Sequence, residues 1–374
     1  CMTDMAAGCA PLGPARDGAI DADELRGLLA SEPALLHALP APETLAHGCR
    51  LYRLCNAAAP AGSVCALGAF DGVHLGHRAL VSSCIAEARE LGAAAVAVTF
   101  DPDPADVLVG PEHGSALLPV SDRIRLLASL GLDAVLVVPF TRQTAATTHE
   151  AFLREWLVPL VGAISLHVGE DFRMGAGGAG TVFALREVAS GLGVRIHGHE
   201  LVRLGGEPVS ATRIRALVRA GNVADTARLL GRYHCVSGVV VHGRGEGTSF
   251  GFPTANVSCS KLSCLPAEGV YAGIACVEGR LWPTAVNVGS PRSFGGEEGQ
   301  AFLEPTLLGF SGDIYGRELT VCFVEWLREP RRFASLEELE RTVLGNVEWV
   351  LRYVGGSEIG YSRLPGESGE RGAL

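Results

Sequence analysis

The most constraining feature of the sequence is a change of hydrophobic pattern along the chain. Between about residues 61 and 198, short continuous apolar runs alternate with helical stretches. Continuous apolar strands joined by helices favour a parallel sheet that is covered on both faces. From about 234 to 326 the strands become short and alternating, with Gly and Pro between them, which indicates a small antiparallel barrel. We therefore expect an α/β module followed by a β-barrel, with the boundary near Gly231 and Arg232.

The predicted strands of the first region should end at one edge of the sheet, where such folds bind ligands. These strands are Val64 to Ala69, Ala94 to Phe100, Ala134 to Val138, Ser165 to Val168 and Val194 to His197. Helices are predicted at His77 to Leu91, Asp122 to Leu130, Glu150 to Leu160, Ala211 to Ala220 and Val223 to Leu230. The barrel strands are predicted at Cys235 to His242, Val270 to Val277, Thr284 to Val288, Ala301 to Gly309 and Glu318 to Glu325.

The two ends of the chain differ from these regions. Two short helices are predicted before residue 60, at Asp21 to Ala30 and from Ser31 onward. A last amphipathic helix begins at Ser335, which with Glu338 has the spacing of a capping box. The tail is rich in Gly, Ser and Glu, and we expect it to be disordered. The predicted domains are an N-terminal extension of unassigned role over 1–50, the α/β module over 51–231, the barrel with its C-terminal helix over 232–354, and the tail over 355–374.

The composition supports two globular cores. The 374 residues are 48% hydrophobic and 19% charged, with a mean hydropathy of +0.25, which excludes a disordered chain. At roughly 150 residues per domain, this length predicts two domains with unpacked ends. The apolar runs end well short of the roughly 18 residues that span a bilayer, and no secretory signal pattern is found. We expect a cytoplasmic protein with no membrane partner.

The charge pattern limits how phosphate can be bound. The net charge is −10, and Lys261 is the only lysine. A general nucleic-acid surface needs clustered basic charge, so no nucleic-acid partner is expected. Phosphates must instead be bound by backbone amides, helix N-termini, arginine, histidine or Mg²⁺.

The cysteines predict buried thiols. The chain has 11 of them and no C-x-x-C pair. Cys65, Cys235, Cys276 and Cys322 lie inside strand-like runs, where a free thiol behaves as a small hydrophobic group. Neither a zinc site nor a disulfide framework is expected.

The motif GAFDGVHLGH, from Gly68 to His77, follows the first predicted strand and opens the first long helix. Its glycines allow close backbone approach to a ligand. His74 and His77 at the positive end of a helix can both reach phosphate oxygens and stabilise charge on a triphosphate that is being cleaved. The surrounding strand, glycines and helix favour this function over a chance pair of histidines.

Two further motifs follow the second and fourth predicted strands of the α/β region. TFDPDP, from Thr99 to Pro104, follows the second strand at the same sheet edge, and by itself it is a turn. VGEDFRMG starts at Val168 and leads into Gly175, Gly177 and Gly180, which have G-x-G-x-x-G spacing. These glycines lie too far from the strand for a dinucleotide-binding turn, which argues against an NAD-dependent oxidoreductase.

The motif VSATRIR, from Val209 to Arg215, opens a helix with two hydroxyl groups and arginine. Ser210 has the position of an N-cap, which is sufficient to explain it. The same geometry places Ser210, Thr212 and Arg215 around an anion, as a lysine-free phosphate site requires.

The barrel region carries its own candidate site. HGRGEGTSFGFPTAN follows the first barrel strand; its glycines predict a mobile flap over phosphates, and Thr254 and Asn256 offer neutral oxygens to Mg²⁺. Glu304 lies in an otherwise apolar strand. From the strand alone it is either a salt-bridged structural group or a general base.

With these motifs in this order, the chain from about Leu51 to Val354 resembles the prokaryotic bifunctional riboflavin kinase/FMN adenylyltransferase (FAD synthetase) family. The resemblance implies a nucleotidylyltransferase-like α/β module joined to a six-stranded kinase barrel. It implies that riboflavin, FMN, FAD and ATP are ligands, that ATP is the co-substrate and that Mg²⁺ is the metal. The implied reactions are phosphorylation of riboflavin to FMN in the barrel and adenylylation of FMN to FAD, with release of pyrophosphate, in the α/β module.

The resemblance also assigns residues. In the adenylyltransferase it implies catalytic roles for His74, His77 and Arg215, and ATP contacts from Gly68, Phe70, His74, Gly76, His77, Ser210, Thr212 and Arg215. The flavin side of that site would be lined by Phe100, Asp101, Asp171 and Phe172. In the kinase it implies an ATP flap at Gly243, Gly247 and Gly251, Mg²⁺ ligands at Thr254 and Asn256, and a catalytic base at Glu304.

This sequence departs from the family pattern at four of these motif positions: Asp103, Ala211, Thr306 and Gly309. The family usually has histidine at the position of Asp103, so a negative charge lies near the expected flavin phosphate. Two alternatives stay open: an enzyme in which only the kinase half is active, and a flavin-binding protein without catalysis.

Overall fold

The computed structural model describes residues 43–44, 49–53, 62–110, 116–242, 254–260, 262–289, 302–330 and 335–355. They form two compact units. The first contains the described residues up to 110 together with Pro119–Ser210, and the second contains 116–118 and the described residues from Ala211 onward. The predicted helices before residue 42, the tail after 355 and the glycines of the flap lie outside the described residues.

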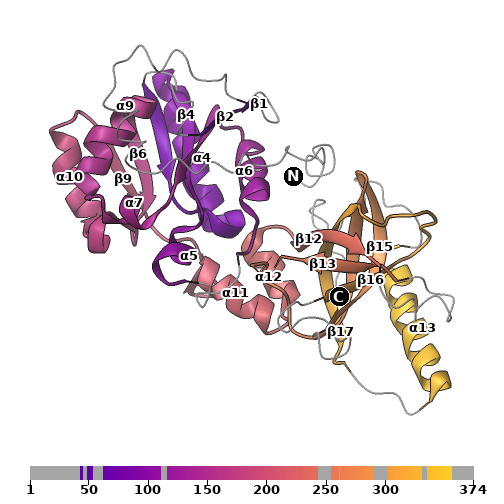
Figure 1. Cartoon of the computed structure of the whole chain (residues 1–374). Helices are drawn as coiled ribbons and strands as arrows, with labels where there is room; N and C mark the ends of the chain where they lie inside the picture. Colours follow the sequence, from indigo (N-terminus) through magenta and orange to yellow (C-terminus); the bar gives the residue numbers. More distant parts are fainter. Residues whose placement is uncertain are drawn as a thin grey trace. The chain divides into compact units, whose positions relative to one another are not determined.

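The first unit is built on a seven-stranded sheet in the order β1-β2-β5-β4-β3-β6-β9 (Figure 1). The strands are β1 (Glu43–Thr44), β2 (Arg50–Arg53), β3 (Ser63–Leu67), β4 (Ala94–Asp101), β5 (Ala134–Pro139), β6 (Ala163–Gly169) and β9 (Arg195–His199). From β2 to β9 every neighbouring pair is parallel, and β1 is antiparallel to β2. The predicted parallel sheet is confirmed, and β1 and β2 are additions that the sequence did not predict.

Helices cover both faces of this sheet, as its continuous apolar strands require. One face of the sheet carries Leu67, Val98 and Leu166. These side chains share a buried core with Trp156, from the helical segment before β6, and with Leu185, from the helix before β9. The helices are α4 (Leu75–Leu91), α5 (Pro104–Leu108), α6 (Val120–Ala128), α7 (Arg142–Ala146), α8 (His149–Ala151), α9 (Val158–Val161) and α10 (Val182–Ser190), with a π-helical segment (Phe152–Leu157) between α8 and α9. On the other face, α4 contacts β3, β4 and β6.

The strand order reverses at β3, which has β4 on one side and β6 on the other. Ligands bind at such a switch point, outside the carboxyl ends of the strands. The loops after β3, β4 and β6 carry the three motifs expected at this edge. The glycines at 175, 177 and 180 lie instead in a hairpin of β7 (Arg173–Met174) and β8 (Gly180–Thr181), and none of them directly follows a strand of the seven-stranded sheet.

The second unit contains a closed antiparallel barrel in the order β12-β13-β16-β15-β14-β17. Its strands are β12 (His234–Val241), β13 (Asn256–Cys259), β14 (Gly269–Val277), β15 (Arg280–Gly289), β16 (Phe302–Leu307) and β17 (Glu318–Arg328). Three helices accompany it: α11 (Ala211–Arg219), α12 (Val223–Leu230) and α13 (Leu336–Tyr353). The barrel and the C-terminal helix are confirmed, and the hydroxyl of Ser335 accepts from the amide of Glu338 at 3.2 Å, as the capping box predicts.

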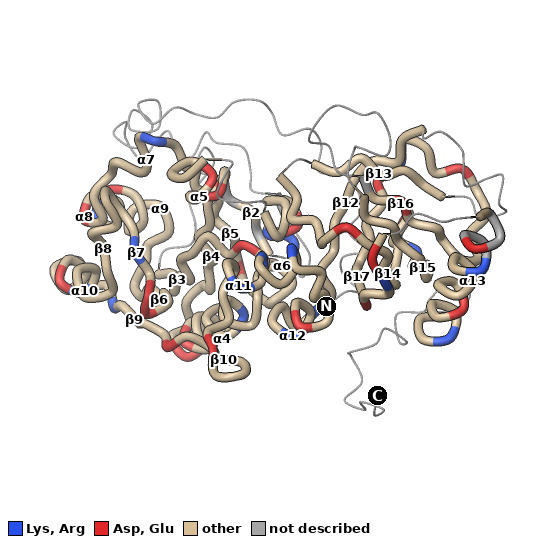
Figure 2. The backbone as a smooth tube through the Cα atoms, turned by 90° about the horizontal axis from the view of Figure 1, so that it is seen from below, with Lys and Arg blue, Asp and Glu red and all other residues tan. Residues whose placement is uncertain are grey.

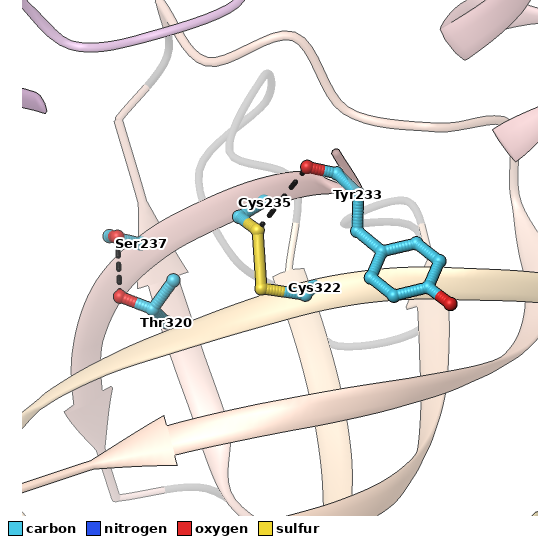
Figure 3. Close-up of a disulfide and its surroundings, with 5 residues drawn as sticks. All are labelled: Tyr233, Cys235, Ser237, Thr320 and Cys322. Carbon is cyan, nitrogen blue, oxygen red and sulfur yellow. Dashed lines mark hydrogen bonds between the residues drawn. A yellow bond between two sulfur atoms is a disulfide. The ribbon is translucent and has the colours of Figure 1, made fainter. Parts of the chain in front are cut away.

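The expectation of free thiols at Cys235 and Cys322 is wrong. These residues lie directly opposite each other on β12 and β17, and their sulfur atoms form a disulfide (Figure 3). Two residues along, the hydroxyls of Ser237 and Thr320 are 2.8 Å apart across the same strand pair. No local pattern indicated the disulfide, because 87 residues separate the two cysteines and only the barrel register brings them together.

Charged residues of both signs occur along the helices and strands of each unit and do not gather on one element (Figure 2). Among the described residues, no helix is both long enough and apolar enough to cross a membrane.

Candidate active sites

The loop after β3 has an unusual backbone. Phe70 and Val73 have φ of 56° and 39°, and Gly72 between them has φ of 77°. Left-handed conformations at non-glycine residues cost free energy and occur where a loop is held for a ligand. Phe70 is 1% exposed and Asp71 is 4% exposed, so this part of the loop is buried in the protein. Gly68 lies against the Phe70 ring, which would be 3.4 Å from an added Cβ.

The two histidines of this loop meet at the N-terminus of α4. Nδ1 of His74 accepts a hydrogen bond from the backbone amide of His77 at 3.3 Å, which makes His74 the N-cap. The rings stack with centroids 3.6 Å apart. Gly76 permits this arrangement, because a Cβ there would lie 3.1 Å from Cε1 and 3.2 Å from Nδ1 of His74. Both imidazoles therefore lie where the backbone amides and the helix dipole favour an anion.

A buried arginine that the sequence analysis missed holds this loop in place. Arg123 on α6 is 2% exposed and donates from Nη1 to the carbonyl of Ala69. The hydroxyl of Thr99, at the end of β4, donates to the same carbonyl at 3.0 Å. Nothing in the sequence around Arg123 distinguished it from the other polar residues of an amphipathic helix.

Arg123 also changes the interpretation of Asp103. Oδ2 of Asp103 lies 3.7 Å from Nη1 of Arg123, and Oδ1 accepts from the amide of Ala105 at 3.0 Å, which caps α5. The negative charge that departs from the family pattern is thus paired with a buried cation and with a helix N-terminus.

The residues expected to line a flavin differ in exposure. Phe100 is 6% exposed and packs its ring against Phe140 and Phe152, so it belongs mainly to the core. Asp101 ends β4, and its carbonyl accepts from the amide of Phe140 at 3.0 Å. In the turn after β6, Asp171 is exposed and Phe172 is partly buried.

The residues of the VSATRIR motif lie at the start of α11. Ser210 precedes the first helical residue, which is the position predicted for an N-cap. Thr212 is exposed, and Arg215 is buried at 7% exposure. Ser210 ends the first unit, and Thr212 and Arg215 belong to the second. Their assignment to an ATP site stays a prediction from the motif.

In the barrel, Glu304 lies in a row of polar side chains across three strands. It is the register partner of Asn287 on β15, whose amide nitrogen donates to Oε2 of Glu304 at 3.1 Å. On the other side, Val257 pairs with Leu303, and the amide of Ala255 donates to the carbonyl of Pro305 at 2.9 Å. Asn256 therefore lies opposite Glu304.

The row faces away from the barrel interior. Val257, Val288 and Leu303 belong to the buried core, and alternate residues of a strand point to opposite faces. Asn256, Glu304 and Asn287 thus share the outer face of the barrel wall, and Thr254, two residues before Asn256, is exposed. A hydroxyl and an amide carbonyl are oxygen ligands of the kind that Mg²⁺ accepts. Asn287 begins a stretch that the family resemblance covers, but its pairing with Glu304 follows only from the register of β15 and β16.

Both regions match known families. A family model described as FAD synthetase matches residues 56–213, and one described as riboflavin kinase matches residues 230–354. The bifunctional riboflavin kinase/FMN adenylyltransferase of Pseudomonas fluorescens is 35% identical over 286 residues, which cover 76% of this chain and 91% of that protein. The enzyme of the same name from Escherichia coli K12 is 35% identical over 283 residues, 75% of this chain and 90% of that protein.

A solved structure supports the arrangement of elements. A crystal structure described as a macrolide-efflux protein from Streptococcus pneumoniae has a TM-score of 0.72 and 28% sequence identity, and it covers 79% of this chain and 95% of that chain. Both family models match in the order that the sequence motifs predict, and the relatives align over nearly their whole length. The chain therefore belongs to the bifunctional riboflavin kinase/FMN adenylyltransferase family.

Proposed function

We propose that this chain carries out both steps of flavin cofactor synthesis, each with the side chains described above. The barrel phosphorylates riboflavin to FMN, and the α/β unit adenylylates FMN to FAD. The observation that supports the proposal is that each unit presents a group of polar side chains where the motifs place a site: the stacked histidine pair after β3 and the Glu304 row on the barrel wall.

In the kinase step, Glu304 acts on the terminal ribityl hydroxyl of riboflavin. Its carboxylate accepts the hydroxyl proton while the oxygen attacks the γ-phosphorus of ATP, the bond to the β-phosphate oxygen breaks, and ADP leaves. Asn287 acts through Glu304, because its 3.1 Å hydrogen bond to Oε2 fixes the orientation of the carboxylate. Phosphoryl transfer depends largely on such positioning.

The residues at and just before the start of β13 suit the magnesium ion of this step. Thr254 and Asn256 would hold Mg²⁺ through neutral oxygens, with the remaining ligands from phosphates and water. The ion would supply neutralisation of the triphosphate charge.

In the adenylyltransferase step, a phosphate oxygen of FMN attacks the α-phosphorus of ATP and pyrophosphate leaves. The attacking group is already anionic, so no protein nucleophile is needed. His74 and His77, with the amides of the α4 N-terminus, stabilise the charge that develops on the triphosphate. Arg123 keeps the loop in the binding conformation through the Ala69 carbonyl.

Asp103 is the main sequence argument for an enzyme with only the kinase half active. Its pairing with Arg123 at 3.7 Å offsets that charge and favours activity in both halves. The glycines of the flap and the pair Thr212 and Arg215 enter this mechanism as predictions from the family resemblance.

Purified protein incubated with riboflavin, ATP and Mg²⁺ tests the proposal, with FMN and FAD separated by chromatography. We expect both products. Glu304→Gln should abolish FMN formation and leave conversion of added FMN to FAD intact. Glu278→Gln, which removes an exposed carboxylate paired with Arg317 in the same unit, is the matched control and should retain both steps. FMN without FAD, even from added FMN, would limit the chain to the kinase; flavin binding without turnover would contradict both assignments.

A further inference from the structure

A carboxylate and three imidazoles cluster in the first unit, far along α4 from the catalytic loop. Glu87 lies twelve residues after Leu75, the first residue of α4, which is roughly 18 Å along the helix axis. His167 on β6 and His197 on β9 are register partners, and His199 follows two residues later on the same side of its strand. All three imidazoles lie on the sheet face that α4 covers.

The polar atoms of the cluster converge on one point. Oε2 of Glu87 lies 2.5 Å from Nε2 of His167, and Oε1 lies 3.4 Å from Nε2 of His197. One ligand atom from each of these three residues lies within 4.8 Å of the others. His167 is 3% exposed. Nε2 of His197 is shielded from solvent and makes no hydrogen bond. The mechanism above uses none of these groups.

We propose that Glu87, His167 and His197 form a binding site for a divalent transition metal of the zinc type. Two imidazole nitrogens and one carboxylate oxygen are a ligand set that such metals use, with a fourth position for water, whereas Mg²⁺ prefers oxygen ligands alone. The ion would join α4 to β6 and to the edge strand β9, and it would be distinct from the magnesium of the two reactions.

The neighbouring groups suit this role. Nδ1 of His167 is 2.8 Å from Nε2 of His199, so His199 can accept the second ring proton of a ligating His167 and orient it. The hydroxyl of Ser165 donates to Oε2 of Glu87 at 2.8 Å.

The carboxylate of Glu87 already contacts two basic side chains. Its Oε2 lies 2.5 Å from Nε2 of His167. Without metal, Nη2 of Arg195 lies 2.9 Å from Oε1 of Glu87 and forms a salt bridge with it. The side chain of Arg195 is 54% exposed, so it can turn into solvent when an ion binds.

One ligand separation already suits a bound ion, and the 2.5 Å contact between Glu87 and His167 must open to about 3.4 Å. Ligand atoms about 2.0–2.1 Å from a tetrahedral ion lie about 3.4 Å apart, and the Glu87 to His197 separation is already 3.4 Å. The side chain of His197 is 42% exposed and can rotate toward the ion.

Cobalt titration of untagged, EDTA-treated protein tests the proposal in Mg²⁺-containing buffer. We expect one equivalent of Co²⁺ to produce the visible absorption of a tetrahedral nitrogen and oxygen site, and Zn²⁺ to displace it and raise the Tm. His197→Ala and Glu87→Gln should each weaken binding at least tenfold, and His199→Ala roughly 10- to 100-fold. Arg195→Ala should strengthen binding, because it removes the competing cation.

Two matched variants exclude other histidines. His149→Ala, a partly buried histidine outside the cluster, and His77→Ala should both retain the cobalt absorption. Its loss in His77→Ala would place the ion at the catalytic pair and overturn the proposal. A Kd weaker than about 100 μM for both metals would also overturn the proposal, as would binding that is unchanged in His197→Ala and Glu87→Gln. Circular dichroism verifies that each variant is folded.

Discussion

His74 caps helix α4 with its own ring: Nδ1 accepts from the backbone amide of His77 at 3.3 Å, and the two imidazoles stack at 3.6 Å. An imidazole nitrogen that accepts a hydrogen bond carries no proton, so the neutral ring of His74 carries its proton on Nε2. The cap thereby selects the tautomer whose Nε2 is a donor, as the proposed contact to phosphate requires. One contact both starts the helix and orients the imidazole that we propose acts in adenylyl transfer.

His74→Asn separates these two roles. Asparagine is among the best N-cap residues, so the Tm should stay within a few degrees of the wild-type value. The Nε2 donor is lost, and removal of one such donor from a charge-stabilising site costs roughly 100- to 1,000-fold in rate. We expect that loss in FMN-to-FAD conversion, measured by chromatography, while riboflavin phosphorylation stays unchanged. A large fall in Tm would mean that the variant reports on folding instead.

Gly76→Ala tests the close approach of the helix backbone to His74. A Cβ at this position would lie 3.1 Å from Cε1 of His74 and 3.5 Å from the carbonyl of Val209, so the ring must shift. Alanine is favoured over glycine in a helix by up to about 1 kcal/mol, which offsets part of the strain. We expect at least a tenfold lower rate of FAD formation at nearly unchanged Tm. Gly345→Ala, where an added Cβ meets nothing within 4 Å, is the control and should not change either activity.

Asp103→Asn tests whether this unusual carboxylate repels the flavin phosphate. Asparagine can still cap α5, and the wild-type charge is already offset by Arg123 at 3.7 Å. The KM for FMN should therefore change by less than about threefold, a difference below 1 kcal/mol. The initial rate of FAD formation against FMN concentration gives this value. A tenfold fall in KM would show that the charge weakens binding after all.

Asn287→Ala tests the orientation of Glu304. Hydrogen bonds to charged groups contribute about 1.5–3 kcal/mol, so loss of the 3.1 Å bond to Oε2 should lower kcat for riboflavin phosphorylation roughly 10- to 100-fold. The KM for ATP should change little, since Asn287 acts through the carboxylate. Steady-state kinetics with riboflavin and ATP distinguish the two parameters. An increase in KM for riboflavin at constant kcat would instead assign Asn287 to substrate binding.

Much of the fold was predictable because the hydrophobic period changes near residue 231, between the parallel sheet and the barrel, although helices α11 and α12 group with the barrel and the two units divide after Ser210. The continuous runs around Val96 and Val135 could only be strands buried on both faces, and helix α12 was predicted to the residue at Val223–Leu230. Strand β13 (Asn256–Cys259) was missed because it is short and directly follows a glycine-rich stretch. Strands β1 and β2 were missed because two to four residues give no period.

Candidate site residues could be predicted where they lie in a local motif. They could not be predicted where contacts between residues far apart in the sequence position them. The H-x-G-H loop was predicted from its neighbouring residues, whereas the strand around Glu304 left two interpretations open and only the family resemblance assigned it as a base; both roles stay predictions. Arg123 reaches the carbonyl of a residue 54 positions away, and Glu87 meets His167 across 80 positions. Such partners follow from the order of the strands, which no local pattern encodes.

His234 predicts how the stability of the barrel depends on pH. It is 2% exposed on β12, and its Nε2 donates to the carbonyl of Cys264 at 2.7 Å. Burial lowers the pKa of His234 from 6.5 to about 4.

Between these two pKa values the unfolded state binds a proton that the folded state excludes. The free energy of unfolding is therefore fully retained above about pH 6.5 and falls as the pH drops toward 4. With about 1.4 kcal/mol per pKa unit, the loss is about 3 kcal/mol. Urea unfolding followed by tryptophan fluorescence at pH 7 and pH 5 should show about 2 kcal/mol of this loss, since pH 5 lies between the two pKa values. His234→Gln keeps a donor for Cys264 without a titrating group, so its midpoint should fall less over this range; an equal fall in both proteins would assign the acid sensitivity to other groups.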